Sequence, residues 1–119
     1  MAYLNQRPVS QGEITFFPVS DDHFDGAETN PMAPRGNHFV VAHSESGNDH
    51  VLERDAVVVS SVRTDVPGMA ILRVLVKEPT SVINLSPHGH KNLPITPGLY
   101  EARISREMGL DDVIRQSSD

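Results

Sequence analysis

The stretch MAILRVLVK, residues 69–77, indicates the fold most clearly. Its apolar residues recur at every second position, and a period of two places side chains on one face of a β-strand. The positions on this face hold Leu72, Val74 and Val76, and the alternate positions hold Arg73, Leu75 and Lys77. We therefore expect a strand with one buried face in the interior of a sheet.

Most other apolar runs are also short and rich in β-branched or aromatic residues, and Gly- and Pro-containing turns separate them. The runs are GEITFFPV (12–19), HFVVAH (38–43), HVLE (50–53), AVVVSSV (56–62), TSVINLS (80–86) and GLYEARISRE (98–107). Six to eight short strands of this kind predict an all-β protein. We expect an antiparallel sandwich, a jelly roll or a small barrel.

The length of 119 residues is typical of one domain. We expect an extended N-terminal arm (1–11), a β domain (12–107) and a C-terminal tail (108–119). Within the β domain, residues 20–37 predict a long loop and residues 87–98 a connection rich in proline and glycine. Only GLDDVIRQ in the tail has a pattern that suits a short helix.

Composition excludes several kinds of function. The chain has no cysteine, which excludes disulfides and thiolate chemistry. Its net charge is −6 and its ten Lys and Arg residues are scattered, so we expect no nucleic-acid partner. The sequence contains neither a long apolar run nor a signal-peptide pattern. We therefore expect no membrane partner and synthesis in the cytoplasm.

Histidines are the candidate metal ligands. In HSESGNDH (43–50), a hairpin around the loop ESGN would place His43 opposite His50, with Cβ atoms about 5 Å apart. His88 and His90 would point to the same side of an extended chain. These four imidazoles could hold zinc, iron or manganese. The alternative is that they are solvated or hydrogen-bonded histidines in ordinary turns.

Four stretches carry a resemblance to known sequences: QGEITFFPV, AHSESGNDHVLE, LRVLVKEPTSVINLSPHGH and LPITPGLYEARISRE. They resemble a diffuse group of small bacterial and phage-borne proteins of unassigned function. That group has a Gly-His-x-Glu-x-Gly-x-x-His hairpin, a His-x-x-His turn and a Leu-Pro-x-Gly-x-Tyr closing strand. This chain differs in having Ala42 in place of the glycine and one residue between His88 and His90. The histidine pattern is also loosely similar to that of cupins.

Two functional hypotheses follow. The first is a non-enzymatic decoration (cement) protein on the capsid of a tailed bacteriophage, with the major capsid protein and copies of itself as partners. In that case the protein would lie on the virion surface and would need no cofactor. The second is a cupin-like metal-binding protein or metalloenzyme that uses the histidine cluster.

Overall fold

The computed structural model describes residues 7–43, 49–85 and 92–105. These residues form ten β-strands and no helix. The strands are β1 (Val9–Gln11), β2 (Ile14–Pro18), β3 (Thr29–Pro31), β4 (His38–His43), β5 (Asp49–Glu53), β6 (Val57–Val62), β7 (Met69–Val76), β8 (Thr80–Asn84), β9 (Leu93–Ile95) and β10 (Gly98–Ser105). The described part contains no helix long and apolar enough to span a bilayer.

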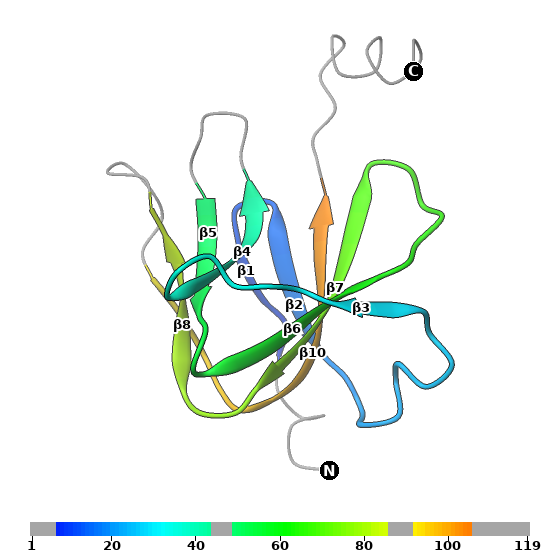
Figure 1. The fold of residues 1–119 in the computed structure, drawn as a ribbon, viewed down its shortest axis with the longest axis horizontal. Coiled ribbons are helices and arrows are strands. Elements are labelled where there is room, and N and C mark those ends of the chain that lie inside the picture. Colours follow the sequence, from blue (N-terminus) through cyan, green and yellow to red (C-terminus); the bar gives the residue numbers. More distant parts are fainter. Residues whose placement is uncertain (1–6, 44–48, 86–91, 106–119) are drawn as a thin grey trace, which may run out of the picture.

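The strands form two antiparallel sheets (Figure 1). The larger sheet has six strands in the order β1-β2-β10-β7-β6-β3, and the smaller has four in the order β4-β5-β8-β9. Apolar side chains from both sheets form a single buried core, including Phe16 and Val74 from the larger sheet and Leu52 and Val82 from the smaller. The all-β class is therefore confirmed, and the arrangement is sandwich-like.

Strand β7 has the predicted interior position. It lies between β10 and β6, and Leu72, Val74 and Val76 point into the core with at most 6% of their surface exposed. The intervening Arg73 and Leu75 are half-buried on the outer face of the sheet. Alternation along this strand thus separates the core from the outside, as the period of two predicts.

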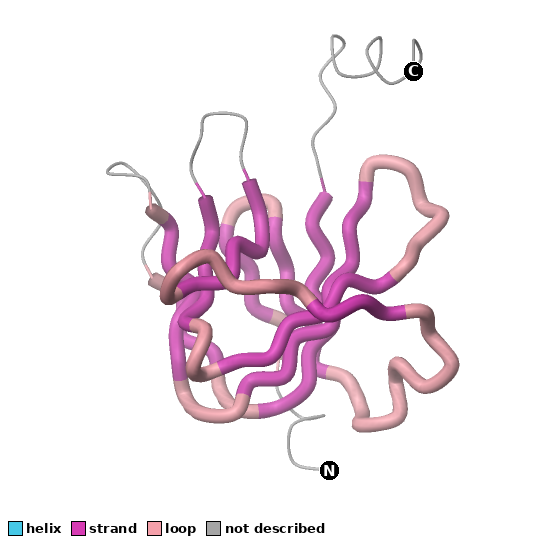
Figure 2. Tube along the Cα trace, viewed as in Figure 1, coloured by secondary structure: helices cyan, strands magenta, loops and turns pink. Residues whose placement is uncertain are grey.

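Three short strands lie in segments for which we expected no strand (Figure 2). The last residues of the expected arm form β1, which pairs with β2. The expected 20–37 loop contains β3, which pairs with the edge of β6, and the expected 87–98 connection contains β9, which pairs with β8. Each has only three residues, too few to show a hydrophobic period. They form because a neighbouring strand offers unpaired backbone groups. The predicted tail helix lies outside the described residues.

Candidate functional site

The predicted histidine hairpin exists, but its register differs from the prediction. Strands β4 and β5 pair as expected, yet His43 is opposite Asp49, and Ala42 is opposite His50. The prediction that His43 and His50 oppose each other is therefore wrong. The register shifts between Val40 and Ala42, as a bulge does when one strand carries an extra residue. Because the side-chain period is two, a shift of one residue changes the face on which partners meet.

Of the four predicted ligands, the structure describes the side chain of His50 alone. His88 and His90, together with the side chain of His43, lie outside the described residues. Within the described part, no three His, Asp or Glu side chains gather as a metal-binding group. The four-histidine site therefore remains a prediction.

His50 itself lies in the protein interior, where only 1% of its surface is exposed. Its Nδ1 atom is 2.8 Å from the side-chain oxygen Oε1 of Gln11. Gln11 is also buried, and its amide nitrogen Nε2 donates a hydrogen bond of 3.2 Å to the carbonyl oxygen of Val82. These contacts link β5 and β8 of the smaller sheet to β1 of the larger one. Buried polar groups need such partners, because an unsatisfied group in the interior is costly.

The turn between β1 and β2 positions a second side chain beside His50. Gln11 pairs with Ile14, so Gly12 and Glu13 form a two-residue hairpin turn. Gly12 has a φ of 59° and the φ of Glu13 is not positive, as in a type II′ turn with glycine first. This turn brings Oε2 of Glu13 to 3.4 Å from Nε2 of His50. The other oxygen of Glu13, Oε1, is buried and has no hydrogen-bond partner among the described residues. We call Gln11, Glu13 and His50 the interior cluster.

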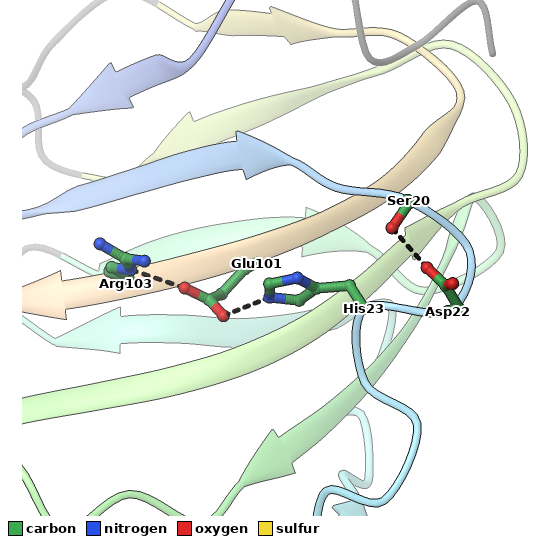
Figure 3. A network of polar contacts seen from close by, with 5 residues as sticks. All are labelled: Ser20, Asp22, His23, Glu101 and Arg103. Atoms are coloured by element: carbon green, nitrogen blue, oxygen red, sulfur yellow. Dashed lines mark hydrogen bonds and ion pairs between the residues drawn. The ribbon is translucent and has the colours of Figure 1, made fainter.

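A second cluster lies on the outer face of the larger sheet and comprises His23, Glu101 and Arg103 (Figure 3). Oε1 of Glu101 is 2.8 Å from Nε2 of His23, and Nε of Arg103 donates a 2.6 Å hydrogen bond to Oε2 of Glu101. The Arg103 guanidinium also lies over the Phe17 ring, 4.6 Å from its centroid, a cation–π contact. Both carboxylate oxygens of Glu101 are therefore occupied by protein groups.

The environment of Glu101 changes its acidity. Burial alone would raise the pKa of this carboxyl, because desolvation disfavours the charged form. The hydrogen bonds from His23 and Arg103, together with the charges of these side chains, outweigh burial, so the pKa lies below its ordinary value of 4.5. Glu101 therefore serves as a charged anchor for its two neighbours.

The outer cluster holds the segment after β2 against the sheet. Successive turns begin at Ser20, Asp22 and Phe24, whose carbonyl oxygens accept backbone hydrogen bonds of 3.0 to 3.1 Å. His23 from this segment reaches Glu101 on β10, as Figure 3 shows. The first part of the long loop expected at residues 20–37 is therefore held by the chain's own carboxylate.

The rest of this outer face carries apolar side chains between polar ones. Cross-strand partners point to the same side of a sheet, so the registers show which residues share the face. Val58 is opposite Leu75, and Val62 is opposite Ile71. Val58 is 42% exposed, and the other three are half-buried. We call these four residues the aliphatic surface, which flanks Arg73 in the centre of the sheet.

The fold and these clusters define an antiparallel β-sandwich with one polar cluster in the interior and one on the face of its larger sheet. The chain belongs to the family described as "Domain of unknown function (DUF8820)", whose model matches residues 10–105. This match spans every described strand except the first residue of β1. No curated protein and no solved structure matches the chain.

Sequence reasoning missed Gln11, Glu13, Glu101 and Arg103 as members of these clusters. Gln11 was assigned to the arm, although the following Gly12 is the signal of a tight two-residue turn. Recognition of that turn would have placed Gln11 in a strand and Glu13 at a hairpin end. The sequence contains no comparable signal for the pairing of His23 with Glu101, because 78 residues separate them.

Proposed function

We propose that this protein is a non-enzymatic interaction protein that binds a protein partner through the aliphatic surface. The observation that carries the proposal is the partial exposure of two apolar cross-strand pairs, Val58 with Leu75 and Val62 with Ile71, on one sheet face. Exposed apolar groups that gather on one face, bordered by polar ones, are typical of protein interaction sites. The turns after β2 are anchored to the same sheet through the contact of His23 with Glu101.

The chemistry of this face suggests what the partner offers. Arg73 lies between Glu101 and Ser60 across the strands, in the centre of the face. An arginine surrounded by aliphatic side chains suits a protein surface that supplies apolar groups and a carboxylate, since guanidinium pairs with carboxylate in two parallel hydrogen bonds. The overall net charge of −6 disfavours nucleic acid as the partner.

The specific form that we propose is capsid decoration in a tailed bacteriophage, with the major capsid protein and further copies of this chain as partners. In this form the protein lies on the virion surface and stabilises the head. A decoration protein requires a stable fold and an accessible binding face. The antiparallel sandwich and the aliphatic surface are the features that support this form of the proposal.

The experiment compares two Val→Glu substitutions at different places on the surface. Val58→Glu introduces a charge into the aliphatic surface, whereas Val66→Glu introduces the same charge at a valine that is 52% exposed in the 63–68 turn. Both valines are well exposed, so both variants should melt near the parent temperature. Each protein is mixed with empty heads of a tailed phage that carries the gene, and the heads are sedimented.

We expect the parent and Val66→Glu to sediment with the heads and Val58→Glu to remain in the supernatant. Failure of the parent protein to sediment would reject the capsid form of the proposal. Equal binding of both variants would reject the aliphatic surface as the contact.

A further inference from the structure

We propose that the interior cluster is a binding site for a divalent metal ion such as zinc, with Nε2 of His50 and the carboxylate of Glu13 as its protein ligands. This site is separate from the aliphatic surface. It also differs from the four-histidine site expected from the sequence, because one of its ligands is a glutamate from the β1–β2 turn.

Hydrogen bonding determines which nitrogen of His50 can bind a cation. Only the amide nitrogen of Gln11 can donate to the carbonyl oxygen of Val82, so the amide oxygen faces Nδ1 of His50. Nδ1 must therefore carry the hydrogen and donate it. In a neutral ring Nε2 then presents a lone pair, and this atom faces Glu13. Histidines that bind metals usually donate their other ring N–H to a protein oxygen in this way.

The approach of Glu13 places two electron-rich groups beside each other. Their separation of 3.4 Å is longer than a normal N–H···O hydrogen bond, which spans about 2.7–3.2 Å. Two donor atoms that each lie about 2.1 Å from a tetrahedral zinc ion would be about 3.4 Å apart. The observed separation therefore matches the distance between two ligands of one zinc ion.

The second carboxylate oxygen of Glu13 is an independent reason to propose a metal ion at this site. Oε1 of Glu13 is buried without a hydrogen-bond partner in the described part of the chain, and burial of an unsatisfied charged oxygen is costly. A cation held by both oxygens of Glu13 would satisfy this atom. The Glu13 side chain is 24% exposed, so its end of the site faces solvent, whereas His50 closes the inner end.

The test uses the full chain, stripped with a chelator and titrated with zinc chloride alone. Calorimetry measures the affinity, and nitrogen-15 NMR of the histidine rings reports which nitrogen binds. Glu13→Gln removes one ligand at nearly constant shape. His23→Gln is the control, because His23 also pairs with a carboxylate but lies on the outer face. Circular dichroism checks that each variant is folded.

We expect zinc to shift the Nε2 signal of His50 in the parent protein. We also expect Glu13→Gln to weaken the binding at this site at least tenfold and His23→Gln to leave it unchanged. If zinc does not bind, or binds without moving the His50 signal, the proposal is wrong. Unchanged affinity in a folded Glu13→Gln variant would also overturn the proposal. If Glu13→Gln does not fold, the NMR signal of the parent decides.

Discussion

The side-chain oxygen of Gln11 lies 2.8 Å from Nδ1 of His50, and this contact joins the two sheets of the sandwich inside the core. Both residues are at least 96% buried, so neither side chain can exchange its partner for bulk water. The contact makes a polar side chain of the first strand part of the interior. It therefore affects stability as well as the chemistry of His50.

Gln11→Ala should destabilise the protein by about 1–3 kcal/mol, because it leaves Nδ1 of His50 and the carbonyl oxygen of Val82 without their partner. Urea unfolding measures this change. Ser10→Ala in the same strand is the control, since Ser10 is exposed and its bond to Thr15 lies at the surface. We expect the control to change the free energy of unfolding by less than about 0.5 kcal/mol. Equal effects of the two substitutions would show that the interior contact contributes nothing specific.

Gly12→Ala and Gly36→Ala should both lose stability by about 1 kcal/mol, because alanine is strained at the positive φ of 59° and 58° that these turns require. No atom lies within 4 Å of the Cβ that would be added at Gly36, so strain of the backbone is the only cost there. Only Gly12→Ala should also shift the ring signals of His50 in NMR spectra, because Gly12 positions Gln11 and Glu13. If both variants left those signals unchanged, the turn would not control the interior cluster.

Acid should destabilise the protein partly through Glu101. Its pKa is lower in the folded state than the ordinary value of 4.5, so the folded state binds fewer protons than the unfolded state in that range. The stabilisation is complete above about 4.5 and is lost as the pH falls through the lowered pKa. Melting temperatures between pH 7 and pH 3 should therefore fall less steeply for Glu101→Gln than for the parent.

Glu28→Gln is the control for this experiment. Glu28 pairs with Arg63 at 3.0 Å, but both side chains are more than 60% exposed, and exposed pairs contribute little. The pH profile of this variant should follow that of the parent. A parallel profile for Glu101→Gln would instead show that the outer cluster has no net effect on stability in acid.

Leu72→Ala should destabilise the protein by about 2–5 kcal/mol, the usual cost of removing a buried leucine side chain. Leu75→Ala should cost clearly less, because Leu75 is in the same strand but half-buried on the outer face. Chemical denaturation of the two variants provides the comparison. If Leu75→Ala were the more damaging change, our assignment of the inner and outer faces of β7 would be reversed.

The sequence by itself determined the all-β class and the orientation of the central strand. A period of two in residues 69–77 is a local property, and local alternation is sufficient to show which side chains of a strand are buried. The apolar runs likewise showed where most of the longer strands lie. Strands of three residues were missed, because they form through pairing with a neighbour and not through a pattern of their own.

Only the tertiary structure decided the chemistry of the histidines. The β4–β5 register depends on a bulge, and a bulge leaves no periodic signal in the sequence. Thirty-nine residues separate His50 from Gln11, and 78 separate His23 from Glu101. Such partners are selected by the packing of two sheets and by the order of strands within them. His50 could therefore be recognised from the sequence as a candidate ligand, but its contacts with Gln11 and Glu13 could not.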